Sequence, residues 1–146
     1  IVSEDPFDKR MMQLAREEGL KSSDWWRRVG SLVLRDGNAV LVGHNQHMPS
    51  EHSPYTLGDI RDFIKAGEMS DLSSSLHSEK VIITMAARKG IALEGTNLYV
   101  STFPCSDCAN WVAFSGIKKC FFGGGHASFQ GEAVLRSFGV ELIYVK

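Results

Sequence analysis

The sequence contains few cysteines, almost no net charge and no long hydrophobic run, and each of these shortages excludes a class of protein. Three cysteines are an odd number and too few for a disulfide framework, which favours an intracellular protein and a cytoplasmic location. No apolar run approaches the roughly 20 residues that are needed to cross a bilayer, and the charged start SEDPFDKR is not typical of a signal peptide. A net charge of -1 gives no electrostatic support for a large polyanionic partner.

Internal repeats and low-complexity segments are also missing, and 146 residues are enough for one domain with one core. We therefore interpret residues 1–146 as a single domain. Its first part predicts a helix over residues 5–19, where apolar side chains recur at helical spacing behind an aspartate cap and a proline. Two strands are expected at about 29–35 and 38–44, because they flank an Asp-Gly dipeptide of the kind that tight hairpin turns prefer.

Residues 45–76 form a polar stretch that we interpret as an insertion between the second strand and the next helix. It contains two prolines, two glycines and three consecutive serines, and only GDIRDFIKAGE within it favours a short helix. A connection of this length without structure of its own is usually functional or disordered. The insertion is therefore a candidate for binding or regulation.

Beyond the insertion, helices and strands alternate, which favours parallel strands joined by right-handed crossovers. The predicted order is helix HSEKVIITMAARKG, strand NLYVSTF, helix PCSDCANWVAFSG, strand KKCFFGG, helix GEAVLRSFG and strand VELIYV. We expect the serines at 73–75 to cap the first of these helices and Gly90 to stop it. The fold class is predicted as α/β with three layers, in which helices cover both faces of a mixed five-strand sheet whose last two strands are parallel.

Two cysteines three residues apart lie directly behind a proline. With Pro104 in the first turn of a helix, Cys105 and Cys108 would lie on one face of that turn and could reach one ion. The partial positive charge of a helix N-terminus favours the thiolate form that zinc needs. His77, at the start of another buried helix, is the expected third ligand, and three protein ligands leave a fourth position for water.

Glu79 follows His77 by two residues and can share its pocket if the two residues straddle the start of the helix. Zinc lowers the pKa of a bound water toward roughly 7. A carboxylate that lies close to this water without binding the metal could take its proton and pass it to a leaving group. We therefore predict that Glu79 is the catalytic residue.

Other uses of the cysteine pair remain open from the residues alone. A CxxC motif in an alternating helix and strand pattern also occurs in redox dithiols. A purely structural zinc site would need a fourth protein ligand, for which His44, His47, His52 and His126 are available. Cys120 is expected to be a small buried residue without chemistry.

The motifs HSE at 77–79 and PCSDC at 104–108 resemble the zinc signature of the cytidine and deoxycytidylate deaminase superfamily. The order of elements over about residues 5–146 is similar too. STFPCSDCANW, the GHN before the long insertion and the last crossover helix resemble the deoxycytidylate deaminases most. The family helix usually reads His-Ala-Glu with an asparagine two places later, where this chain has Ser78 and Val81.

This resemblance implies a cytidine-deaminase-like fold, a bound Zn2+ held by His77, Cys105 and Cys108, and a homo-oligomer. It implies hydrolytic deamination of a cytosine nucleotide, with dCMP as the expected substrate, to the uracil nucleotide and ammonia. It also suggests contacts to the substrate. The candidates are Asn45 for the sugar or base edge, the backbone near Thr102 and Phe103 for the amino group, and Arg27 for a 5′-phosphate, with Tyr55, Arg61 and Lys65 as further candidates for the phosphate.

Two other functions compete with this interpretation. A deaminase of polynucleotides would flip a base of single-stranded DNA or tRNA into the same pocket, although the near-neutral charge does not favour it. A non-catalytic module would keep the zinc only to stabilise the fold, which an intact His77 and Glu79 do not favour. No membrane partner is expected.

Overall fold

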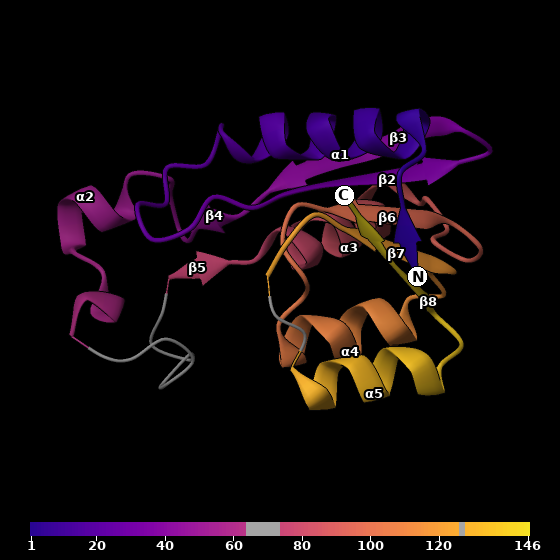
Figure 1. Ribbon diagram of the computed structural model, residues 1–146. Coiled ribbons are helices and arrows are strands. Elements are labelled where there is room, and N and C mark those ends of the chain that lie inside the picture. Colours follow the sequence, from indigo (N-terminus) through magenta and orange to yellow (C-terminus); the bar gives the residue numbers. More distant parts are fainter. Residues whose placement is uncertain (64–73, 126–127) are drawn as a thin grey trace.

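The computed structural model describes residues 1–63, 74–125 and 128–146 of the chain. At its centre lies a six-stranded sheet with the order β1-β8-β7-β6-β2-β3, and a separate two-stranded sheet pairs β4 with β5. In Figure 1 the helix α1 lies on one face of the large sheet, and α4 and α5 lie together on the other. The elements are β1 (Val2–Ser3), α1 (Pro6–Gly19), β2 (Gly30–Arg35), β3 (Asn38–His44), β4 (Gln46–His47), α2 (Ser53–Leu57), the 3-10 turn η1 (Ile60–Asp62), β5 (Ser75–Leu76), α3 (Ser78–Lys89), β6 (Asn97–Val100), α4 (Ser106–Phe114), β7 (Lys119–Phe122), α5 (Phe129–Ser137) and β8 (Glu141–Val145).

The three-layer α/β/α fold class is confirmed, whereas the count of five strands is wrong by one. The last two strands, β7 and β8, pair in parallel as expected, and β6 is parallel to β7. The additional strand is β1, which pairs in parallel with β8 at the edge of the sheet. Two residues are too short to show the alternating pattern by which a strand is recognised, so β1 carries no signal in the sequence.

Helix α1 and the alternation of the strands explain the two cores. Asp5 caps α1 by accepting a hydrogen bond of 2.7 Å from the N–H of Phe7, as expected. Successive residues of a strand point to opposite faces of a sheet, so Leu32 and Val33 of β2 enter different cores. One core lies under α1 and contains Met11, Met12, Ala15, Leu32, Leu34, Tyr99, Phe121, Ile143 and Val145. The other lies under α3, α4 and α5 and includes Val33, Ile82, Leu98, Val100, Val112, Cys120 and Leu135.

The segments that carry the candidate site residues meet at one end of the strands of the large sheet, which forms one edge of the sheet. Strand β2 is antiparallel to both of its neighbours, so β3 and β6 run in the same direction. Gly30 at the start of β2 pairs with His44 at the end of β3, and Ser31 pairs with Val100 at the end of β6. The chain before β2 and the chain after β3, β6 and β7 therefore meet at one edge. In α/β sheets this is the edge where ligands bind.

The start of α3 differs from the expectation. The N-cap residue is His77, in an extended conformation and without a side-chain capping bond. Ser75 belongs to β5, and Ser73 lies outside the described residues, so the predicted serine cap is not observed there. Gly90 ends the helix in a left-handed conformation with φ 67°, as predicted.

The described part of the insertion is folded and closed at its base. Gln46 of β4 pairs with Leu76 of β5, and His47 pairs with Ser75, so the insertion returns to the body directly before His77. Figure 1 shows α2 and β4 to one side of the sheet and its helices. Of the segment GDIRDFIKAGE, the structure describes only the 3-10 turn at Ile60–Asp62, and residues 64–73 lie outside the described residues.

A buried ionic cluster, made of Asp24, His47, Asp59 and Arg61, joins the insertion to the segment before β2. The guanidinium of Arg61 lies 2.6 Å from a carboxylate oxygen of Asp24 and 2.6 Å from one of Asp59. Nε2 of His47 lies 3.1 Å from Asp24. Burial alone would raise the pKa of Asp24, but hydrogen bonds from Arg61 and from the backbone N–H groups of two neighbouring residues lower it.

Removing Arg61 should therefore leave two buried carboxylates without a cation. We expect Arg61→Met to lower the free energy of unfolding by about 2 to 3 kcal/mol at pH 7, toward the lower end for a buried pair because the Arg61 side chain keeps some contact with water. The pKa of Asp24 is lowered from 3.8, so this contribution exists above that pH and disappears as the pH falls through the folded-state pKa. Urea denaturation at pH 7 and pH 3 measures both effects.

The matched control is Arg136→Met, which breaks an exposed pair between Arg136 and Glu132 within α5. Its cost should stay below about 0.5 kcal/mol. Equal costs for the two variants at pH 7 would contradict the role given to the cluster.

Candidate metal centre

Three side chains that could hold a metal ion meet where α3 and α4 begin. His77 is the N-cap residue of α3, and Cys105 is the N-cap residue of α4. Nδ1 of His77 lies 3.4 Å from Sγ of Cys105 and 3.3 Å from Sγ of Cys108. The three ligand atoms lie within 4.8 Å of one another, and they form the one such group of histidine, cysteine and acidic residues in the described part of the chain.

These separations fit a tetrahedral zinc ion. Zinc binds a histidine nitrogen at about 2.0 Å and a thiolate sulfur at about 2.3 Å, which places two such ligands about 3.5 Å apart in a tetrahedron. The nitrogen-to-sulfur distances of 3.3 and 3.4 Å agree with this value. Neither cysteine forms a disulfide bond. His77, Cys105 and Cys108 therefore fit zinc with one coordination position left over.

The start of α4 lies two residues after the predicted start at Pro104. Pro104 precedes the N-cap residue instead of occupying the first turn, and α4 itself begins at Ser106. Cys105 accepts a hydrogen bond of 3.4 Å from the backbone N–H of Cys108, which is the bond that a capping side chain makes. The two sulfurs still converge, because an N-cap side chain and the third helical residue are neighbours.

The two cysteines share a proton. The pKa of Cys105 is lowered to about 4, first because Cys108 donates a hydrogen bond to its sulfur, and further by the hydrogen bond with His77. The pKa of Cys108 is raised, because its proton is held by Cys105 and because the side chain is largely buried. The pKa of His77 is raised as well, chiefly by its hydrogen bond to Cys105. The directions of these shifts favour the thiolate at Cys105 and the thiol at Cys108.

Glu79 lies in the first turn of α3 and is buried, with 4% of its surface exposed. Burial raises the pKa of its carboxyl group. The charge of His77 and a hydrogen bond with Cys108 lower this pKa, but their effect is smaller. Glu79 is not a member of the ligand group. The catalytic role expected for Glu79 remains a prediction at this point.

The serine that replaces the usual alanine in this motif has a partner. Ser78 is fully buried, and its hydroxyl lies 2.7 Å from the hydroxyl of Ser31 on β2. The bond attaches the first turn of α3 to the start of β2. Ser31 is also fully buried, so an alanine at position 78 would leave its hydroxyl without this bond.

The described histidines that could have supplied a fourth ligand lie outside the ligand group. His44 lies 3.1 Å from Glu18, and His47 belongs to the buried ionic cluster. His52 is exposed in the insertion, and His126 lies outside the described residues. None of the described histidines other than His77 joins the group. Cys120 is fully buried in β7, as expected.

The substrate candidates nearest the ligands lie after β6. Thr102 and Phe103 directly precede Pro104, at the edge of the sheet where β6 ends. The ring of Phe103 is buried and meets Phe122 edge to face, with 4.9 Å between the ring centres. Its backbone N–H donates to the carbonyl of Gly124 over 2.8 Å.

Asn45 and Arg27 lie at the same sheet edge and are linked to each other. The amide oxygen of Asn45 accepts a hydrogen bond of 2.9 Å from the N–H of Val29, and its amide nitrogen donates one of 2.7 Å to the carbonyl of Arg27. Asn45 is buried, whereas Arg27 is exposed, and no hydrogen bond or ion pair with the described residues engages the guanidinium of Arg27. Asn45 therefore fixes the backbone from which Arg27 extends.

Tyr55 and Arg61 form a third group, inside the insertion. The hydroxyl of Tyr55 donates to the carbonyl of Ser23 over 3.1 Å, and its ring meets Trp25 edge to face. Arg61 is bound by Asp24 and Asp59. Both side chains attach the insertion to the segment before β2. Lys65 lies outside the described residues.

The sequence profile described as "Cytidine and deoxycytidylate deaminase zinc-binding region" matches residues 5–124. The chain belongs to the cytidine and deoxycytidylate deaminase family. It is 36% identical over 129 residues to the deoxycytidylate deaminase of Enterobacteria phage T2, covering 87% of this chain and 69% of that protein. It is 29% identical over 129 residues to the deoxycytidylate deaminase of Enterobacteria phage T4, covering 87% of this chain and 67% of that protein.

The fold is also that of a dCMP deaminase. The crystal structure of dCMP deaminase from the cyanophage S-TIM5 in complex with dCMP and dUMP superimposes with a TM-score of 0.74 at 22% identity, covering 97% of this chain and 99% of that chain. The match to a zinc-binding region and the converging ligands of this deaminase agree on zinc as the cofactor. No helix in the described part of the deaminase is long and apolar enough to cross a membrane.

Lys80 and Asp107 were not singled out from the sequence. Lys80 follows Glu79 and forms an ion pair with Asp107, which lies between the two cysteines. The pKa of Lys80 is raised, chiefly by its hydrogen bond with Asp107. The two ligand cysteines also raise it through their negative charge. The signal in the sequence that could have identified Lys80 is its place as a basic residue directly after Glu79.

The shared proton leads to a prediction about zinc uptake. Zinc needs two thiolates and a neutral imidazole, so its binding must displace the proton of Cys108 and that of any charged His77. We expect between one and two protons to be released per zinc near pH 7, and the apparent affinity to rise by about tenfold per pH unit for each proton released. Calorimetry in buffers of different ionisation enthalpy counts the protons.

The control is Cys120→Ala, which removes a thiol outside the ligand group and should release the same number. Zinc binding without proton release near pH 7 would contradict the assignment of one thiol and one thiolate.

Proposed function

We propose that this protein is a zinc-dependent hydrolytic deaminase that converts dCMP and water to dUMP and ammonia. The observation that supports it most is the buried carboxyl group of Glu79 beside a His77, Cys105 and Cys108 group with zinc spacing. The family membership supports it too, because relatives over most of the chain carry the name deoxycytidylate deaminase.

The chemistry divides between the metal and the protein. When bound, zinc supplies a Lewis acid that makes water a nucleophile near neutral pH. Glu79 accepts a proton as water adds to C4 of the cytosine ring and gives it to ring nitrogen N3. It then carries the second proton of the water to the amino group, which leaves as ammonia. Burial raises the pKa of Glu79, which suits a carboxyl group that must both take and give a proton.

The hydrogen bonds that each candidate residue already makes suggest what role it has toward the substrate. The leaving amine is a hydrogen-bond donor, so the backbone near Thr102 and Phe103 would have to offer it acceptors. Arg27 has an unengaged guanidinium on a fixed backbone, which suits a 5′-phosphate. Asn45 positions Arg27 in addition to facing the sugar or base. Tyr55 and Arg61 act indirectly, because their polar groups hold the insertion in place.

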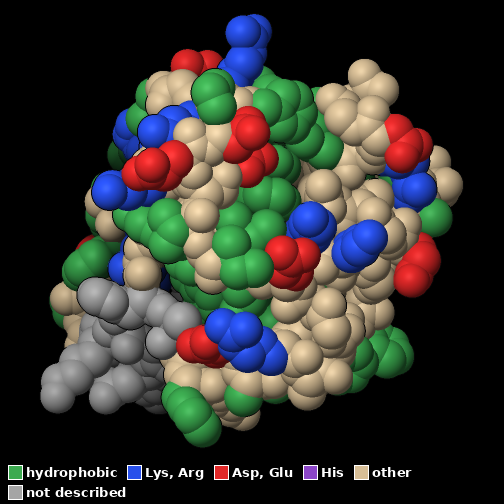
Figure 2. All heavy atoms as spheres, turned by 45° about the vertical axis from the view of Figure 1, so that its right-hand side comes forward, with side chains coloured by type: hydrophobic (Ala, Val, Ile, Leu, Met, Phe, Trp, Pro, Cys, Tyr) green, Lys and Arg blue, Asp and Glu red, His purple; other side chains and the backbone are tan. Residues whose placement is uncertain are grey.

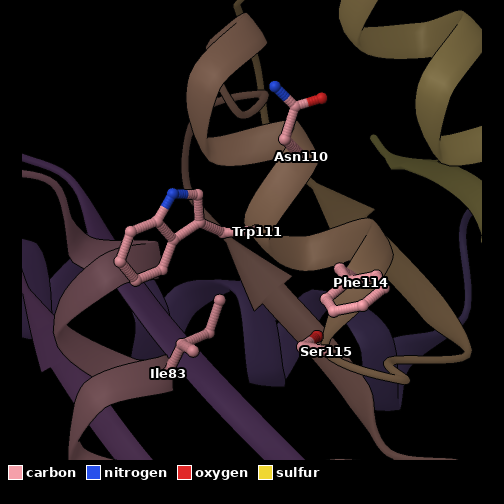
Figure 3. A pocket seen from close by; sticks show the side chains of 5 residues that line it. All are labelled: Ile83, Asn110, Trp111, Phe114 and Ser115. Carbon is pink, nitrogen blue, oxygen red and sulfur yellow. The ribbon is translucent and has the colours of Figure 1, made fainter.

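Self-association would use a face that is rich in exposed aromatic side chains. Phe114 and Phe138 are 84% and 58% exposed, with 6.3 Å between their ring centres. Figure 3 shows Trp111 and Phe114 beside a hollow that Ile83 and Asn110 also line. Exposed aromatic side chains of this size are typical of protein interfaces. We propose this face of α4 and α5 for the homo-oligomer that the sequence predicts.

Ammonia release from dCMP, CMP, deoxycytidine, cytosine, guanine and a single-stranded oligonucleotide tests the activity. We expect dCMP to react fastest, and Glu79→Gln to lower kcat by about 100- to 10,000-fold while metal analysis still finds zinc. Full turnover by Glu79→Gln would remove Glu79 from the mechanism, and no reaction with any compound would favour a non-catalytic zinc module.

Faster reaction on the oligonucleotide, with binding that weakens steeply as salt rises, would favour a polynucleotide deaminase. One face of the molecule can be inspected for such a basic surface. On the face in Figure 2, acidic and basic side chains are interspersed around hydrophobic ones, and the described part of that face has no continuous basic surface.

Arg27 gives a sharper test of the nucleotide specificity. Arg27→Met should reduce kcat/KM for dCMP by about 10- to 100-fold, as the loss of a charged hydrogen bond predicts, and leave kcat/KM for deoxycytidine unchanged. Arg28→Met is the matched control, because Arg28 is the exposed neighbour and should change neither value. Equal losses on dCMP and deoxycytidine would show that Arg27 does not bind the phosphate.

A further inference from the structure

Lys80 connects the two helices that carry the metal ligands. It belongs to the first turn of α3, and its ammonium group forms an ion pair with Asp107 in the first turn of α4. The same ammonium lies 5.3 Å from the ring centre of Trp111, also on α4. One cation from α3 therefore contacts an anion and an aromatic ring of the other helix.

Lys80 and Asp107 lie in the same helix turns as the metal ligands. Lys80 follows the N-cap residue His77 by three positions, which puts both on the first turn of α3. Asp107 lies between Cys105 and Cys108, and Trp111 follows Asp107 by four positions, so both face the same side of α4. Figure 3 shows the Trp111 ring extending from α4 toward Ile83 of α3.

The geometry of the zinc centre is sensitive to the relation between these helix starts. His77 comes from one helix and both sulfurs from the other, and zinc coordination tolerates deviations of only about 0.2 Å. Between the described side chains at this junction, the ligands' own hydrogen bonds and the contacts of Lys80 join the two first turns. The side chain of Lys80 is 23% exposed and that of Asp107 is 62% exposed, so water shields the ion pair mainly from the Asp107 side.

We propose that Lys80, Asp107 and Trp111 form a clamp that holds the ligand-bearing starts of α3 and α4 at zinc spacing, and that the positive charge of Lys80 also attracts the dithiolate. Lys80 and Asp107 are positioning residues in this proposal and do not bind the metal. Residues that orient metal ligands typically change metal affinity by about 10- to 100-fold when they are replaced. The proposal rests on the zinc centre of the proposed function.

Zinc affinity, measured by competition with a chromophoric chelator, tests the clamp independently of turnover. We expect Lys80→Met to weaken zinc binding by about 10- to 100-fold, Asp107→Asn to weaken it less, and the double variant to bind no more weakly than Lys80→Met. Lys80→Arg keeps the charge and the contact with the ring, so it should retain most of the affinity.

Lys119→Met is the matched control, because it breaks another ion pair between two elements, that of Lys119 on β7 with Glu141 on β8. It should bind zinc like the wild type. Thermal unfolding of the metal-free variants separates a specific loss of zinc affinity from general destabilisation. Affinity of Lys80→Met within twofold of the wild type, or additive losses in the double variant, would overturn the clamp. Absence of zinc binding by the wild type would instead overturn the proposed function.

Discussion

The structure depends on the convergence of two helix starts at one edge of the sheet. Because β2 is antiparallel to both neighbours, β3 and β6 end together, and the chain that follows each of them leads to a ligand-bearing helix. His77 and Cys105 are N-cap residues, so their backbones stay extended and their side chains turn toward the metal position. At that position the lowered pKa of Cys105 favours the negative charge that a cation requires.

The insertion helps to place the first of these helix starts. The β4 and β5 ladder ends at Leu76, directly before His77, so the first ligand is held by the pairing that closes the insertion. The ionic cluster around Asp24 attaches the same insertion to the segment before β2, where Arg27 extends from a backbone fixed by Asn45. A change in the insertion is thereby coupled to both the metal ligand and the proposed phosphate contact.

The sequence predicts the parts of this arrangement that rest on local pattern. The hairpin, the parallel end of the sheet, the ligand motifs and the helices outside the insertion follow from spacing and turn residues. Helix α2 at Ser53–Leu57 was not predicted, because only GDIRDFIKAGE was expected to be helical in the insertion. The remainder depends on partners distant in sequence. Ser75 pairs in β5 instead of capping α3, and the guanidinium of Arg61 is bound by Asp24, which lies far ahead of it in the chain. Neither contact has a local signal, because propensity describes a residue without its partners.

Glu79 shows why the site needs support from the fold. A buried carboxyl group with a raised pKa favours its protonated form, and ionising it at neutral pH opposes folding. The metal-free protein therefore places an unfavourable group in the first turn of α3. The neighbouring bonds of Ser78 to Ser31 and of Lys80 to Asp107 attach this same turn to β2 and α4. They offset part of that cost without occupying the carboxyl group, so Glu79 keeps both the position and the proton affinity that the proposed deamination requires.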